Sequence, residues 1–261
     1  MNLPLQDLES VYDPLNYCMY CGSLNNLIDE HIIPYGLHGL GILPKSSCKD
    51  CAIETGSFEE FVLRGPWRGL SDYLKRNSPR LKEAPTYLPF TILRDGEEEV
   101  VELLLEDHPV LLFFPKFSPP SMFTGYHVQG ISLSGVFIYN LGKPIDLVLA
   151  ELGVKSFRLP QTANPVPFAR MIAKVGWAMA CAQRHHLRLD LDKSIGSVIV
   201  DKPNEIGRWV GTYADSVEKV EGALHEVHIR EEQGLMLADV KFFSYSNSNT
   251  PRYAVILGPL K

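Results

Sequence analysis

Three short motifs decide the fold: CMYC at residues 18–21, DEHIIP at residues 29–34 and CKDC at residues 48–51. A Cys-x-x-Cys turn directs two thiolates toward one point, and two such turns supply the four soft ligands of a tetrahedral zinc site. The alternatives are four unrelated buried thiols or two redox dithiols, but the paired spacing within one short segment favours the metal. We therefore predict a structural Zn²⁺ ion with four ligands: Cys18, Cys21, Cys48 and Cys51.

The residues between and after these motifs predict a strand, a loop, a second strand and a helix. Apolar residues on both sides of the Glu30-His31 pair favour a strand there. Pro34 and three glycines that follow it predict a loop, and residues 42–44 predict a short second strand. The second Cys-x-x-Cys motif opens a helix that ends at Gly65-Pro66.

The rest of the chain predicts a second region of different character. We place the boundary in a basic, proline-bearing segment, which gives an N-terminal module over residues 1–85 and an α+β domain over residues 86–261. One long helix is expected at residues 167–185, where apolar residues recur at helical spacing to form one buried stripe. This stripe consists of Phe168, Ile172, Val175 and Met179. The expected strands cover residues 100–105, 110–114, 131–139, 226–231, 235–243 and 253–257.

Composition excludes several classes of protein. Of the 261 residues, 45% are hydrophobic and 21% are charged, which is ordinary for a globular protein. The first ten residues have no basic start followed by an apolar run, so we expect no signal peptide. No apolar run is long enough to cross a bilayer, and the cysteines are too few for a secreted disulfide scaffold. We therefore expect a cytoplasmic protein that makes no membrane contact.

A basic cluster follows the predicted zinc module. The whole chain has a net charge of −6, but residues 64–82 contain six basic side chains and one acid. Such a patch suits phosphate clamping, and the acidic remainder limits loose binding elsewhere. Trp67 and Tyr73 lie among these charges and suit either base stacking or core packing. The candidate nucleic-acid-binding residues are Arg64, Arg68, Lys75, Arg76, Arg80 and Lys82.

The motifs together resemble a known family. An acid followed by His-Ile-Ile-Pro, a glycine-bearing loop and Ser-Cys-Lys-Asp-Cys at a helix start are similar to the zinc-stapled HNH endonucleases of the ββα-metal type. FARMIAK at residues 168–174 and TPRYAVILG at residues 250–258 also resemble a bacterial and phage group of HNH proteins. The predicted fold is therefore α+β, with an N-terminal ββα-metal (HNH) module followed by a mostly antiparallel β domain that contains one long buried helix.

The resemblance implies a metal-dependent endonuclease that hydrolyses phosphodiester bonds of DNA, in bacterial or phage defence. In HNH enzymes the histidine of the acid–His pair is the general base, which assigns this role to His31. The residue before it is a metal ligand, which assigns Glu30 to a catalytic Mg²⁺ or Mn²⁺ ion, and a carboxylate oxygen suits either metal. Histidine ordinarily titrates near neutral pH and can accept the proton of an attacking water. Cleavage would leave a 5′ phosphate and a 3′ hydroxyl.

Two departures from the family pattern leave the ligand set open. The loop over residues 36–47 lacks the family's central Asn, and Ala52 follows the second motif where the family has His or Asn. The helix offers Glu54 and Glu59 as further acidic ligands, and helical spacing does not choose between them. The resemblance favours Glu59, because a Phe-Glu pair recurs in the related group. His38 is interpreted as a solvated loop side chain in preference to a ligand.

A second function from another class stays open. The missing Asn and the missing third ligand favour a zinc-containing nucleic-acid-binding module without catalysis, whereas the intact Glu30-His31 pair favours the enzyme. A zinc-stabilised adaptor for protein partners is a third, weaker interpretation. The expected partner is DNA, with RNA as an alternative. A homodimer is also expected if the enzyme makes double-strand breaks, and residues 86–261 would serve recognition or assembly.

Overall fold

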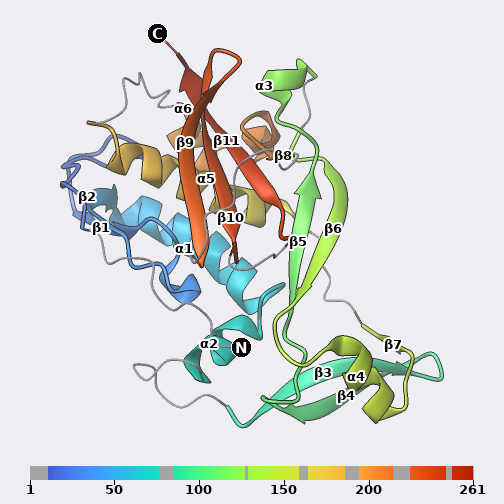
Figure 1. Cartoon of the computed structure of the whole chain (residues 1–261). Coiled ribbons are helices and arrows are strands. Elements are labelled where there is room, and N and C mark those ends of the chain that lie inside the picture. The colour runs from blue at the N-terminus through green and yellow to red at the C-terminus, as the bar shows by residue number, and fades with distance from the viewer. Residues whose placement is uncertain are drawn as a thin grey trace. The chain divides into compact units, whose positions relative to one another are not determined.

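The computed structural model describes residues 11–76, 85–126, 129–158, 164–185, 194–213, 224–244 and 249–260. The chain folds into two compact units. Unit 1 consists of residues 1–3, 61–114 and 138–163, and unit 2 consists of residues 4–60, 115–137 and 164–261. Figure 1 labels the helices and strands of both units. The division of function at residue 85 stays a prediction.

The N-terminal part of unit 2 has the predicted order of two strands and a helix. β1 (Leu27–His31) and β2 (Ile42–Cys48) pair in antiparallel, and α1 (Lys49–Arg64) follows β2 directly. A short 3₁₀ helix, η1 (Tyr35–Leu37), lies in the loop between the strands. We call these elements, together with the preceding turn at residues 18–21, the ββα module.

Two local features shape the end of β1. A register shift between Ile28 and Glu30 breaks the alternation of the strand, so that Ile28 and Asp29 are exposed and Glu30 is buried. A β-carbon at Gly39 would lie 2.1 Å from the carbonyl oxygen of Ile33, so the loop can return this close to the strand only with glycine. Both features hold the segment around His31 in a fixed path.

The C-terminal part of unit 2 is a four-stranded antiparallel sheet in the order β8-β11-β10-β9. The β9–β10 hairpin turns at Gln233-Gly234, as the alternating sequence predicts, and the predicted last strand pairs with β10. β8 is an additional strand that the sequence does not predict. The strands are β8 (Val210–Tyr213), β9 (His225–Glu232), β10 (Leu235–Phe242) and β11 (Arg252–Pro259). The helical elements before them are α6 (Ser194–Val200) and η2 (Pro203–Arg208).

Helix α5 (Val166–Ala182) lies between this sheet and the ββα module (Figure 1). On one side it packs against β10 and β11, where a β-carbon at Gly176 would lie 2.9 Å from the Cβ of Val255. On the other side, Trp177 Nε1 donates a hydrogen bond to the Met19 carbonyl oxygen at 2.9 Å. Residues 168–178 are all buried, so the centre of α5 is covered on every side and not along one stripe only.

Unit 1 contains a three-stranded antiparallel sheet in the order β4-β3-β7. Its core is a cluster of Phe90, Ile92 and Val148, which brings α4 against the sheet. Pro89 is tolerated within β3 because β7 pairs only with Ile92 and Leu93, so the proline removes no hydrogen bond on that side. The elements are α2 (Leu70–Arg76), β3 (Tyr87–Arg94), β4 (Glu97–Leu104), α4 (Ile145–Leu152) and β7 (Ser156–Phe157).

A two-stranded ribbon of β5 (Leu111–Phe117) and β6 (Leu133–Asn140) has residues in both units, and the short helix α3 (Ser121–Thr124) lies between its strands in sequence. The predicted α+β class and antiparallel character are confirmed. The long helix and the C-terminal hairpin also form where the sequence predicts them. Within the described residues, no helix combines the length and the apolar character that crossing a membrane requires.

Candidate metal centre and active site

The four cysteines of the two Cys-x-x-Cys motifs converge on one point. The sulfur atoms of Cys18, Cys21, Cys48 and Cys51 all lie within 4.8 Å of one another. The Sγ atoms of Cys21 and Cys48 are 3.7 Å apart. With zinc–sulfur bonds of about 2.3 Å, two ligands of a tetrahedral site lie about 3.8 Å apart, so this spacing fits a zinc ion. The cluster can therefore hold a structural metal such as zinc.

The backbone on both sides of the cluster explains this convergence. The first motif is a tight turn, closed by a hydrogen bond from Gly22 N–H to the Cys18 carbonyl oxygen at 2.8 Å, with Gly22 at a φ of 78°. The second motif spans the junction at which β2 ends with Cys48 and α1 begins. Burial and the neighbouring sulfur atoms raise the pKa of the Cys51 thiol. Bound zinc stabilises the thiolate form of such ligands, so metal binding would release protons.

Glu30 and Glu59, two of the candidate metal ligands, lie on either side of a lysine. Lys174 Nζ lies 2.9 Å from Glu30 Oε1 and 3.0 Å from Glu59 Oε1. The ammonium also donates a hydrogen bond to the His31 carbonyl oxygen. The Lys174 side chain is 0% exposed, while those of Glu30 and Glu59 are 10% and 19% exposed. We call these three side chains the Glu–Lys–Glu triad.

Lys174 is thus a buried charge whose ammonium does not reach solvent. Burial alone would lower the pKa of its ammonium, but the two carboxylates outweigh burial and raise that pKa above its ordinary value. The ammonium is therefore charged at neutral pH, and its three hydrogens face three oxygen atoms. Sequence offers one signal for this role: Lys174 is a cation in the middle of a helix that is apolar on every side, where only buried acids could balance it.

The triad bears directly on the predicted catalytic metal. A Mg²⁺ or Mn²⁺ ion between Glu30 and Glu59 would occupy the space that the Lys174 ammonium fills, so these residues do not fit a divalent ion in this arrangement. The other candidate ligand, Glu54, points elsewhere. Its Oε1 accepts a hydrogen bond from Arg170 Nη2 at 2.7 Å, and its side chain is 44% exposed. The catalytic divalent ion therefore finds no support in the geometry.

His31 lies at the end of β1 and is half-buried. Its Nδ1 is buried and has no hydrogen-bond partner among the described residues. The ring of Tyr35, an exposed residue of η1, lies 5.4 Å from the imidazole, centroid to centroid, at an interplanar angle of 50°. His38, the other histidine of this loop, is half-buried, and burial lowers its pKa. The module thus presents one imidazole and one aromatic ring side by side.

The predicted basic cluster lies only partly within the described residues. Arg64 and Arg68 are exposed in unit 1, while Arg80 and Lys82 fall outside the described part. Lys75 and Arg76 belong to α2. Trp67 is a core residue: it is 0% exposed, and its Nε1 donates to the Phe113 carbonyl oxygen at 2.9 Å. Of the two explanations for this aromatic side chain, core packing is the correct one.

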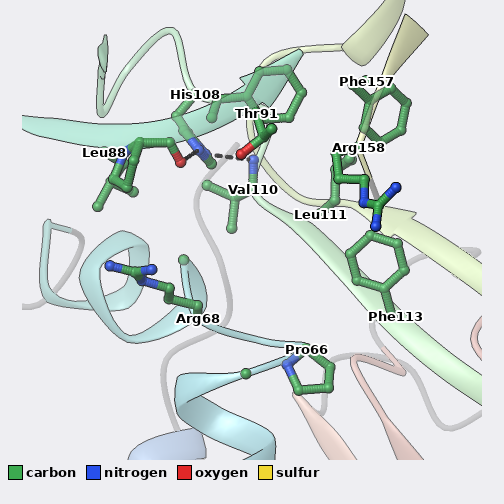
Figure 2. A pocket seen from close by; sticks show the side chains of 14 residues that line it. Pro66, Arg68, Leu88, Thr91, His108, Val110, Leu111, Phe113, Phe157 and Arg158 are labelled. Carbon is green, nitrogen blue, oxygen red and sulfur yellow. Dashed lines mark hydrogen bonds between the residues drawn. The ribbon is translucent and has the colours of Figure 1, made fainter. Parts of the chain in front are cut away.

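Unit 1 contains a cavity of about 220 Å³ between β3, the start of β5 and the segment after α1 (Figure 2). Phe90, Phe113 and Phe157 contribute apolar walls, and Arg68 and Arg158 contribute positive charge. Figure 2 shows Arg68 on one side of the hollow and Arg158 on the other, beside Phe113. No residue among the described ones that line this cavity is acidic. The sequence predicts Arg68 as a phosphate contact but does not predict the cavity.

Comparison with known proteins adds no family to this geometry. No family model matches the chain, and searches of curated proteins and of solved structures found no significant match. The zinc-compatible cysteine cluster and the antiparallel α+β fold are therefore shown by the structure, and the resemblance to HNH endonucleases is one of sequence motifs only.

Proposed function

We propose that the ββα module is an HNH-type nuclease site that hydrolyses phosphodiester bonds of DNA, with His31 as the general base. The observation that carries this proposal is the position of His31. Its imidazole is half-buried at the end of β1 beside the exposed ring of Tyr35, and its own carbonyl oxygen is held by a fully buried ammonium. A general base needs such a fixed position, because proton transfer depends on hydrogen-bond distance to the reacting water.

The proposed reaction assigns one task to each group. Nδ1 of His31 is buried, which leaves Nε2 to accept a proton from the attacking water. The water oxygen bonds to phosphorus as the bond from phosphorus to the 3′ oxygen breaks, and the leaving 3′ oxygen takes a proton from solvent. The exposed ring of Tyr35 can stack on a base or pack on a sugar next to the scissile bond. The cysteine cluster, when it holds zinc, fixes the turn before β1 to the start of α1. Zinc thus supports the fold of the module and takes no part in the chemistry.

The test is cleavage of a supercoiled plasmid by the full chain, with His31→Ala as the variant and His228→Ala as the control. His228 lies on β9, and its side chain is 40% exposed. Loss of a general base lowers the rate by roughly 100-fold or more, so His31→Ala should be almost inactive while retaining zinc. The control should cut like the wild type. Equal cutting by all three proteins would rule out His31 as the base.

One observation favours a second candidate function, a nucleic-acid-binding module without catalysis. The triad neutralises one of the two carboxylates that the enzyme would use for a metal, and Ala52 offers no ligand atom in its side chain. Such a module would shift DNA on a gel, with a strong dependence on salt, but would leave a plasmid intact. The plasmid assay combined with a gel-shift assay therefore separates the two functions.

A further inference from the structure

Lys174 comes from a helix more than a hundred residues away in sequence, yet it lies at the centre of the predicted active site. It forms two ion pairs and one hydrogen bond, all with residues of the ββα module. The ammonium lies within 3.0 Å of an oxygen atom of each glutamate, and the Lys174 side chain is 0% exposed. It is therefore not accessible to a phosphate and acts through the residues that it contacts.

We infer that Lys174 takes the place of a divalent ion between Glu30 and Glu59, and that it is a positioning residue for His31. The positioning of His31 depends on the proposed function. The exclusion of a metal ion between Glu30 and Glu59 depends only on geometry. A buried carboxylate needs a cation or a proton, and the chain supplies the cation itself.

A second buried polar group of the ββα module is Tyr20. It is 3% exposed, and its hydroxyl has no hydrogen-bond partner among the described residues. The hydroxyl thus donates no hydrogen bond to Glu30 or Glu59 there, and Lys174 is the side chain that contacts both acids.

Arg170 provides a matched comparison on the same helix. It is also buried and also contacts an acid of α1, but only one, Glu54. Its Nε donates to the Ile199 carbonyl oxygen at 2.6 Å, and its Nη2 also donates to the Val200 carbonyl oxygen at 3.0 Å, both at the end of α6. Removing Arg170 would leave a single, partly exposed carboxylate, whereas removing Lys174 would leave one buried and one half-buried carboxylate facing one space.

The experiment measures Mn²⁺ binding to the zinc-loaded full chain by electron paramagnetic resonance. Wild type and Glu59→Gln should bind Mn²⁺ alike, because no ion is held between the acids. Lys174→Met should bind Mn²⁺ at least about tenfold more tightly, since two carboxylates become free to chelate, and Arg170→Met should not. If Glu59→Gln weakens Mn²⁺ binding of the otherwise unchanged protein by about tenfold or more, the inference is wrong.

The positioning role is tested separately, by the kinetics of plasmid cleavage. For folded, zinc-containing Lys174→Met, kcat of plasmid cleavage should fall by about tenfold or more while KM stays unchanged, because substrate does not touch Lys174. An unchanged kcat would overturn this role. If the wild type cuts no nucleic acid, the proposed function fails, but the Mn²⁺ result still decides whether Lys174 replaces an ion.

The cavity of unit 1 carries an independent inference. Its geometry points to a site for a nucleotide, with the base between the apolar walls of Phe90, Phe113 and Phe157 and the phosphate at Arg68 or Arg158. Among the described residues, exposed Arg68 has no side-chain partner, whereas Arg158 pairs with the exposed Glu98 at 3.2 Å. The free guanidinium of Arg68 favours an anion, and aromatic walls favour a flat ring.

The test is titration of the full chain with dAMP, with inorganic phosphate and with a short oligo-dT strand, followed by calorimetry. dAMP should bind, and Arg68→Ala and Arg158→Ala should each weaken that binding by about fivefold or more, while Arg64→Ala changes nothing. If oligo-dT binds more tightly than dAMP, the ligand is the end of a nucleic-acid strand. If dAMP binds more tightly than oligo-dT, the ligand is a free nucleotide. Absence of dAMP binding, or equal binding of phosphate alone, would contradict the inference.

Discussion

The ββα module contains two clusters that the sequence predicts as metal centres, and they differ in the source of their positive charge. The cysteine cluster gathers four sulfur atoms within 4.8 Å, an arrangement that suits a bound cation. Between Glu30 and Glu59 the positive charge is already supplied by the Lys174 ammonium, which neutralises one of the two carboxylates. Acidic residues that converge thus do not by themselves predict a metal site, because a distant lysine can fill the same space.

The largest expected effect comes from the cysteine cluster. Cys51→Ser should abolish zinc binding and unfold the ββα module, because structural zinc sites contribute on the order of 10 kcal/mol to folding. Zinc content and circular dichroism on heating measure both effects. Cys181 is the control: this fifth cysteine is buried outside the cluster, so Cys181→Ala should keep zinc. A folded, cooperative Cys51→Ser protein would show that the cluster has no structural role.

The next effect is the loss of the buried lysine. Lys174→Met should destabilise the protein by roughly 3–5 kcal/mol, because it leaves buried Glu30 and half-buried Glu59 without this partner. Urea unfolding measures this change. Replacing both acids by Gln in the Lys174→Met background should recover part of the loss, because it removes the unbalanced charges. A loss below about 1 kcal/mol in the single variant would mean that the triad contributes as little as a surface ion pair.

A contact between the module and the C-terminal sheet makes stability depend on pH. Burial lowers the pKa of His225 to about 4, and its Nε2–H donates to the Leu37 carbonyl oxygen at 2.8 Å. Because the folded pKa is depressed, the full contribution is present above about pH 6.5 and is lost as the pH falls toward 4. Between pH 7 and 4.5 this amounts to roughly 2–3 kcal/mol.

Urea unfolding of wild type and His225→Gln at both pH values tests this dependence. Acid also weakens the thiolate cluster, but that loss is common to both proteins and cancels in the difference. The wild type should therefore lose about 2 kcal/mol more than the variant. Equal losses would show that His225 is not the group that senses the acid.

The smallest expected effect is at the other acid of α1. Glu54→Gln should change stability by no more than about 1 kcal/mol, because the Glu54 side chain is 44% exposed and water screens its pair with Arg170. Glu59→Gln should cost more, since Glu59 belongs to the buried triad. Side-by-side urea curves of the two variants measure the difference. A larger loss of unfolding free energy for Glu54→Gln than for Glu59→Gln would show that Glu54, and not Glu59, makes the stronger ion pair.

How far the sequence predicts the site depends on how far apart its parts lie in the chain. The cysteine cluster and the order of β1, β2 and α1 follow from spacing and periodicity within one segment, and both form as predicted. The pairing of Glu30 with Glu59 also follows from the resemblance. The partner of both acids does not, because Lys174 meets them only through the packing of α5 against the module.

Unit 1 teaches the same lesson about local signals. The prolines of the segment after α1 indicate a boundary, yet β3 forms there, because Pro89 lies where β7 does not pair. Trp67 sits among charges in the sequence and is nevertheless fully buried, since its indole reaches the Phe113 backbone 46 residues later. Charge and proline content describe the surface of a segment, while its core contacts depend on residues from elsewhere.

The most direct test of the account is the metal content of the wild-type chain, counted by native mass spectrometry after exposure to both Zn²⁺ and Mn²⁺. The account predicts one zinc ion per chain and no retained manganese, because the cysteine cluster chelates and Lys174 fills the place between Glu30 and Glu59. A chain that retains one manganese ion together with zinc, and loses only the manganese in Glu59→Gln, would contradict it.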